Sequence, residues 1–77
     1  MIVVTFFTHH AAMMTHRALV QKGISAKMAP VPRSLSSSCG SSVFVDADTL
    51  DFSLLDEDTE AVYKQESKGY IEIYKSE

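Results

Sequence analysis

Cys39 is the single cysteine of this 77-residue chain, and it lies in the segment Pro-Val-Pro-Arg-Ser-Leu-Ser-Ser-Ser-Cys-Gly-Ser-Ser at residues 30–42. A structural thiol is usually buried among apolar groups, whereas hydroxyls, one guanidinium and a glycine flank this one. The thiolate is the form of cysteine that attacks electrophiles, exchanges sulfur and binds metals. We therefore expect a reactive loop thiol; the alternative is a small buried side chain at the end of a loop.

The residues around Cys39 suggest how such a thiol would be held. Arg33 is predicted to hold an anion or the thiolate, with a solvated strand-end charge as the alternative. Gly40 allows a positive φ and a close approach of backbone N–H groups to an anion. Among the six serines of the segment, Ser38 and Ser41 are predicted to face the sulfur, and the others to form turns.

The histidines are candidates for a metal site or a general base. His9 and His10 are adjacent, so on a helix they point about 100° apart, and His16 lies roughly 10 Å further along the axis. Helical ligand pairs are normally about four residues apart, so we predict no metal and no cofactor. One histidine could instead join Cys39 in a metal site completed by a second subunit. The simplest role for His9 and His10 is in the first turn of the helix, beside the thiol.

Hydrophobic patterning predicts the elements that would position these residues. The first half of the chain begins with an apolar run and a hydroxyl residue that can cap a helix. A helical pattern that ends at a glycine and two further strand patterns follow. Two prolines confine the second strand to a sheet edge. The predicted elements are a strand at Ile2–Phe7, a helix at 9–22 capped by Thr8 and Gly23, an edge strand at Ile24–Val31, and a short strand at Val43–Val45.

The second half is predicted to contain one more helix and one more strand. Acidic residues in the first turns favour a helix from about Asp56 to Ser67, and alternation favours a strand at Tyr70–Lys75. The predicted order β-α-β-β-α-β closes as a ferredoxin-like α+β sandwich, a single domain over residues 1–77. Its four strands would lie in the order 4-1-3-2, with both helices on one face.

This topology predicts where the thiol would lie. The first two strands would run parallel and end at one edge, so that the Cys39 loop and the start of the first helix share one end of the domain. The helix N-terminus, the two histidines and Arg33 would then lower the pKa of the Cys39 thiol. The carboxylates at 46–51 would lie at the other end, which disfavours a Cys-His hydrolase with an orienting carboxylate.

Composition excludes several classes of function. Lys and Arg number 7 against 10 Asp and Glu, so the net charge of −3 argues against binding of DNA or RNA. No apolar run approaches the roughly 20 residues of a membrane helix, and no signal peptide is recognised. A lone thiol suits a reducing cytoplasm. The helix-free sheet face, with Val3, Phe7, Ala29, Val31 and the tyrosines, is predicted to meet a second copy or another protein.

The segment at 30–40 resembles the signature of small bacterial domains described as selenium/sulfur carrier protein-like. The resemblance covers nearly the whole chain and carries weight at Pro32, Arg33, Cys39 and Gly40. It implies a cytoplasmic domain whose thiol carries sulfur or selenium. Cys39 would accept the atom from a donor such as a cysteine desulfurase and pass it to an acceptor protein, so the chain would be a carrier rather than a self-sufficient enzyme. The alternative is a small interaction module with a passive cysteine.

Overall fold

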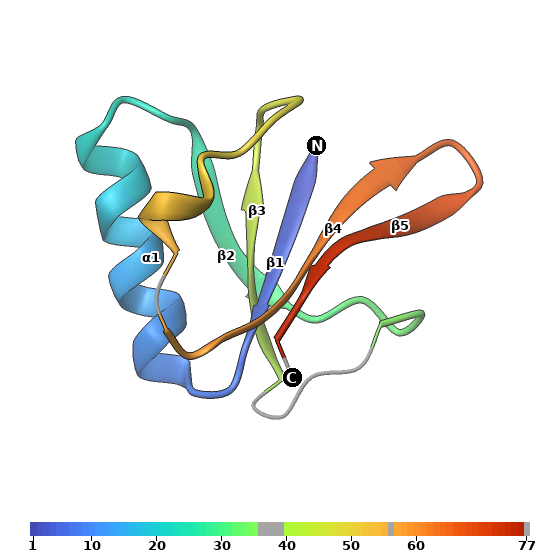
Figure 1. The fold of residues 1–77 in the computed structure, drawn as a ribbon, viewed down its shortest axis with the longest axis horizontal. Helices are drawn as coiled ribbons and strands as arrows, with labels where there is room; N and C mark the ends of the chain where they lie inside the picture. The colour runs from blue at the N-terminus through green and yellow to red at the C-terminus, as the bar shows by residue number, and fades with distance from the viewer. Residues whose placement is uncertain (36–39, 56, 77) are drawn as a thin grey trace.

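The central strand of the sheet is β1 (Ile2–Phe6), and all five of its residues have no exposed surface. The structure, a computed structural model, describes residues 1–35, 40–55 and 57–76. These residues form a five-stranded sheet in the order β2-β3-β1-β4-β5, with every neighbouring pair antiparallel (Figure 1). The other elements are α1 (His9–Gln21), β2 (Ala26–Pro30), β3 (Ser41–Val45), the 3-10 turn η1 (Phe52–Leu54), β4 (Thr59–Glu66) and β5 (Gly69–Lys75).

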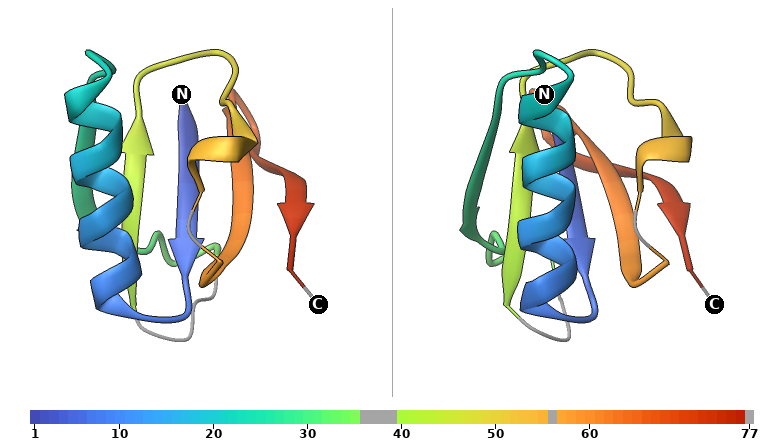
Figure 2. Two further views of the ribbon diagram at one scale, coloured as in Figure 1. Left: turned by 60° about the vertical axis from the view of Figure 1, so that its left-hand side comes forward. Right: turned by 90° about the vertical axis from the view of Figure 1, so that its left-hand side faces the viewer.

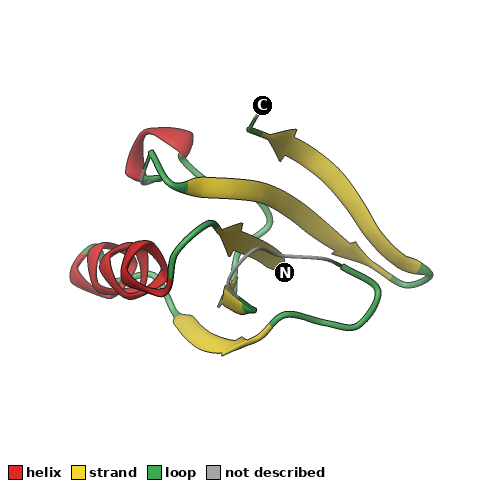
Figure 3. Ribbon diagram, turned by 90° about the horizontal axis from the view of Figure 1, so that it is seen from below, coloured by secondary structure: helices red, strands yellow, loops and turns green. Residues whose placement is uncertain are grey.

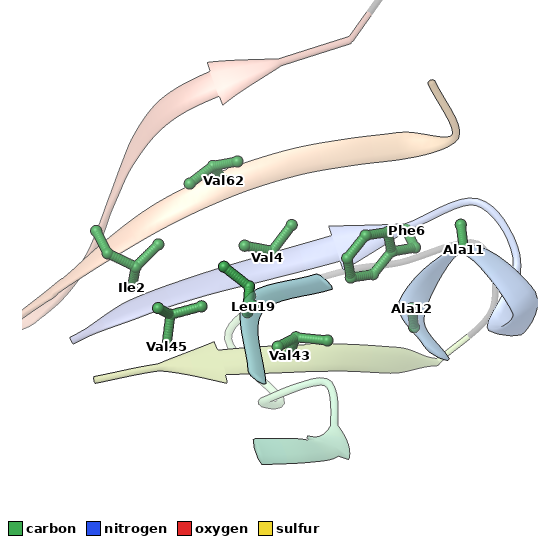
Figure 4. Packing of buried hydrophobic residues seen from close by; sticks show 9 residues of the cluster. All are labelled: Ile2, Val4, Phe6, Ala11, Ala12, Leu19, Val43, Val45 and Val62. Carbon is green, nitrogen blue, oxygen red and sulfur yellow. The ribbon is translucent and has the colours of Figure 1, made fainter. Parts of the chain in front are cut away.

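The hydrophobic core lies between the sheet and α1. Alternate residues of β1 point to the same face, so Ile2, Val4 and Phe6 all face the helix (Figure 4). Val62 from β4 and Leu19 from α1 close the same cluster. Because β1 is covered on this face and paired along both edges, it anchors everything attached to its ends.

The helix begins and ends where the sequence predicts. The Thr8 hydroxyl accepts a hydrogen bond from the Ala11 N–H at 3.1 Å, which satisfies one of the free donors of the first turn. At the other end, the N–H of Gly23 donates to the Val20 carbonyl and that of Ile24 to the Leu19 carbonyl. Gly23 has a φ of +79°, so the end is a Schellman motif with glycine in the left-handed position.

The predicted ferredoxin-like sandwich is wrong. A second helix was predicted from Asp56 to Ser67, but residues 59–66 form β4, which pairs along β1, and the segment predicted as the fourth strand is β5, outside β4. Within the described residues the fold is thus five antiparallel strands with one α-helix, and mostly β. The first half keeps its predicted order of strand, helix, strand and strand, with the proline-containing β2 at the sheet edge.

The connection between β3 and β4 lies on the side of the sheet where the second helix was expected. Asp51 caps η1 by accepting hydrogen bonds from the N–H and the hydroxyl of Ser53, and these bonds hold the pKa of Asp51 below its ordinary value. Leu54 and Leu55 pack against the core cluster beside α1. Figure 2 shows this connection on the same side of the sheet as α1. It covers the sheet near β1 and β4 and leaves β5 without a helix above it.

The face of the sheet opposite α1 is covered in part by the chain itself. Val3 and Thr5 point to that face, since they alternate with the core residues of β1, and both are fully buried. The chain that follows β2 runs across this side of the sheet (Figure 3), and Val31 and Leu35 there are half-buried. Val3 is therefore buried on this face whereas Phe7 is exposed, and the predicted docking of a partner there stays a prediction.

Candidate functional site

Three strand ends meet at one end of the sheet, which we call the loop end. In the register of the strands, Pro30 at the end of β2 lies opposite Ser41 at the start of β3, and Thr5 near the end of β1 lies opposite Ser42. The chain leaves β2 at this edge and returns into β3 at the same edge. The segment that contains Cys39 is therefore bounded on both sides by the loop end.

The backbone closes the base of the segment. The Val31 N–H donates to the Gly40 carbonyl at 3.2 Å, which continues the β2–β3 ladder by one further bond. Gly40 has a φ of +73°, where a β-carbon is strained, although a β-carbon there would meet nothing within 4 Å. Gly40 thus adopts the positive φ that glycine allows, and a β-carbon there is disfavoured by backbone conformation rather than by crowding.

The start of α1 lies against the exit of the segment. His9 Nδ1 and Ser41 Oγ are 3.0 Å apart, within hydrogen-bonding distance, and this contact joins the first turn of α1 to the first residue of β3. His10 is exposed on the next helical position. The helix N-terminus carries a partial positive charge from its free N–H groups, so the loop end has a local attraction for anions.

The remaining predicted site residues lie on or within the segment itself. Arg33 is exposed in a turn closed by a hydrogen bond from the Leu35 N–H to the Pro32 carbonyl. Ser38 and Cys39 lie outside the described residues. The structure thus brings His9 and Ser41 together, and leaves the predicted approach of Arg33, Ser38 and His10 to the thiol as a prediction.

Sequence reasoning missed an acidic residue at this end. The Asp58 carbonyl accepts a hydrogen bond from the Phe7 N–H at 2.8 Å, so Asp58 lies beside the residue that precedes the Thr8 cap. This position follows from the start of β4, where Thr59 pairs with Phe6. The prediction of a helix for this segment gave no pairing with β1, so it did not place Asp58 beside Phe7. As expected, Asp46 and Asp48 follow the opposite end of β3, away from the loop end.

His16 has a structural role. It is half-buried on α1, and its Nε2 lies 3.1 Å from the Ala26 carbonyl of β2, to which it donates a hydrogen bond. Over residues 1–35, 40–55 and 57–76, no three side chains of His, Asp or Glu are grouped closely enough to hold a metal ion. Within the same residues, no helix is long and apolar enough to cross a membrane.

A surface pocket of about 400 Å³ lies at the other end of the sheet. Met1, Lys27, Phe44 and Asp46 are among its lining residues, at or near the start of β1 and β2 and the end of β3. Ala29, one residue before the end of β2, also lines it, so the pocket extends along β2 toward the loop end.

The family model described as "Putative Se/S carrier protein-like" matches residues 1–75. The chain belongs to this family, which confirms the resemblance seen at residues 30–40. The description suggests a carrier of selenium or sulfur. No curated protein and no solved structure matches the chain.

Proposed function

We propose that this protein carries one sulfur or selenium atom on the side chain of Cys39. The observation that carries the proposal is the family match over residues 1–75 in a chain with a single cysteine. A family of carriers needs an atom that can form and break a bond to sulfur or selenium. Cys39 supplies the one thiol in this sequence that can do so.

Sulfur transfer would proceed as a thiol exchange without net oxidation. The Cys39 thiolate attacks the outer sulfur of a donor enzyme's persulfide, a new S–S bond forms to Cys39, and the donor's own S–S bond breaks to release its cysteine as a thiolate. The proton of the donor persulfide travels with the transferred sulfur. An acceptor thiolate then repeats the attack on the outer sulfur, and Cys39 leaves as the thiolate. Selenium follows the same sequence with an S–Se bond.

The loop end offers support for the anionic form of the thiol. Gly40 directly follows Cys39 in the chain, and Ser41 contacts His9 at the start of α1. A positive helix terminus and nearby cations favour a thiolate over a thiol.

Partners follow from the cysteine count. One cysteine cannot resolve a persulfide within the chain, so both exchanges take place between molecules. The donor is proposed to be an enzyme of the cysteine desulfurase class, and the acceptor a protein with its own reactive thiol. Both reactions require a reducing compartment such as the cytoplasm.

Intact-mass spectrometry after incubation with a cysteine desulfurase and free cysteine tests the proposal. We expect a gain of one sulfur atom per chain, mapped to Cys39 and removed by dithiothreitol. Cys39→Ser is the matched control, because it differs by one atom and leaves every described contact in place. A wild-type chain that gains no sulfur, or a Cys39→Ser chain that gains as much, would show that the thiol is not the carrier.

The second candidate is an interaction module in which the thiol is passive. It is favoured by the exposed apolar side chains of η1 and β5. The rate of Cys39 alkylation against pH separates the two functions. An activated thiol reaches half its maximum rate below the ordinary cysteine pKa of about 8.5, and a passive one at or above that value.

A further inference from the structure

Four large apolar side chains lie exposed on η1 and β5: Phe52 at 44 %, Ile71 at 53 %, Ile73 at 42 % and Tyr74 at 37 %. We call them the β5 patch. The rings of Phe52 and Tyr74 meet edge to face, with centroids 5.6 Å apart, so the turn and the strand form one surface.

The β5 patch lies on the same side of the sheet as α1. Tyr74 is paired with Val62, a core residue that faces the helix, and Ile71 is paired with Lys64, two residues further along β4. Opposite residues of an antiparallel pair point to one face. Ile73 is the extra residue of a bulge between these pairs. The predicted second helix would have covered this side of the sheet. In its absence, the described residues leave the β5 patch exposed.

The outer edge of β5 also lacks a pairing strand among residues 1–35, 40–55 and 57–76. The opposite edge, β2, is protected by Pro30 and lies against α1. β5 contains seven residues without a proline, and its side chains from Ile71 to Lys75 are all exposed. Such an edge offers unpaired backbone N–H and C=O groups to another strand on either side of the bulge at Ile73.

The charges of β5 are complementary to those of a second copy. In an antiparallel pairing with its two-fold axis between Ile73 and Tyr74, Glu72 lies opposite the partner's Lys75. The symmetry produces this pair twice. The same register places Ile73 beside the partner's Tyr74, so the two β5 patches join into one apolar surface.

Neighbouring registers fit less well. Glu72 is paired with Tyr63 and Lys75 with Ala61, two positions on the same face of β4, so these two charges can meet across the new edge. An axis at Glu72 would place two carboxylates opposite each other. An axis at Ile73 would place Glu72 opposite the partner's Tyr74, which points to the other face.

We propose that two copies of this chain form a two-fold dimer by antiparallel pairing of their β5 edges, with Glu72 against the partner's Lys75. The inference rests on the register, exposure and charge of β5 and is independent of the carrier function. The dimer extends the sheet across the axis.

Sedimentation velocity over a range of protein concentrations tests the proposal. Wild type should approach twice the monomer mass of 8.5 kDa. Glu72→Lys and Lys75→Glu should each weaken the dimer by about tenfold or more, because each replaces two attractive pairs by two repulsive ones. The double variant Glu72→Lys/Lys75→Glu restores opposite charges and should dimerise again.

Glu66→Lys and Lys68→Glu are the matched controls, since they make the same charge changes at exposed positions near the tip of the hairpin, outside the proposed register. Both should dimerise like wild type, and circular dichroism should show that every variant is folded. A wild-type monomer at all concentrations would assign the β5 patch to a different protein and overturn the proposal. A dimer that survives both single reversals, or that the double variant fails to restore, would also overturn it.

Discussion

The loop end and the β5 edge are the two surfaces for which we propose functions, and they are built in opposite ways. The loop end is polar, and its residues attach directly to the buried strand β1 through Thr8, Ser41 and the β1–β3 ladder. The β5 edge exposes the apolar β5 patch beside Glu72 and Lys75, and β1 and β4 separate it from β3. Chemistry needs side chains held in fixed positions, whereas association needs accessible surface.

The two regions differ in how much of their structure is buried in the core. Residues near the loop end are attached to the fully buried strand β1. Substitutions there should therefore affect folding or the geometry of the first helical turn. The side chains of β5 are largely exposed in the folded chain, so their substitution removes few packing contacts. Their substitution should change association and leave the folded chain nearly as stable.

Phe6→Ala should give the largest effect, because it removes a fully buried ring at the end of β1. Such truncations lower the free energy of unfolding by about 3–5 kcal/mol. Ile71→Ala, on the exposed strand, should change it by no more than about 0.5 kcal/mol. Urea denaturation of both variants at a concentration where wild type is monomeric measures the contrast. Equal losses would contradict the division between a buried anchor and an exposed edge.

Gly40→Ala should come next in size. The φ of +73° places a β-carbon in the left-handed region, which is unfavourable by about 1–2 kcal/mol. Because a β-carbon there meets nothing within 4 Å, the loss should reflect backbone strain alone. Gly40→Asn is the control, since asparagine tolerates this conformation better, and it should lose less. If both variants are as stable as glycine in urea denaturation, the base of the Cys39 segment is not fixed as described.

Thr8→Ala should lower stability by about 1 kcal/mol through loss of the helix cap. Thr8→Ser keeps the hydroxyl and should retain most of that stability. Chemical denaturation followed by circular dichroism measures both changes. A Thr8→Ala protein as stable as Thr8→Ser would mean that the hydroxyl does not hold the start of α1.

The smallest effect concerns Tyr63, which neighbours Glu72 on the hairpin. Burial raises the pKa of Tyr63 above its ordinary value of 10.0, and the charges of Glu72 and Glu60 act in the same direction. The folded state therefore holds this proton more tightly than the unfolded state. Stability should be unaffected below pH 10.0 and should fall as pH rises through the folded pKa.

Thermal melts between neutral and alkaline pH measure this loss, and Tyr63→Phe should reduce it. An ultraviolet titration of wild type against Tyr63→Phe should assign to Tyr63 a phenolate that forms above pH 10.0. A Tyr63→Phe protein that loses stability at the same alkaline pH as wild type would contradict the burial of this ring.

Local signals predict the first half of the fold because each element has its own marker. Thr8 caps the helix, Gly23 ends it, and Pro30 marks an edge strand. The same reasoning failed at residues 59–66, where Ala61, Val62 and Tyr63 suit either a helix or a strand. Only pairing with β1 decides between them, and that contact joins residues about sixty positions apart.

The candidate site also has features that local sequence signals predict and features that they do not. Gly40 and Thr8 were predictable because a special backbone conformation and a helix cap have local signatures. The contact of His9 with Ser41 and the position of Asp58 depend on strand register, which the sequence pattern does not specify. A two-residue turn at Ser67–Lys68 followed by Gly69 was the local signal for the β4–β5 hairpin.

The most direct test of the account is the fraction of chains that gain one sulfur atom from a cysteine desulfurase, compared by intact mass among wild type, Lys75→Glu and Cys39→Ser. We predict equal loading of wild type and Lys75→Glu, because the loop end carries the atom and the β5 edge does not, and no loading of Cys39→Ser. Absence of loading in wild type, or loading that persists without Cys39, would contradict the central claim.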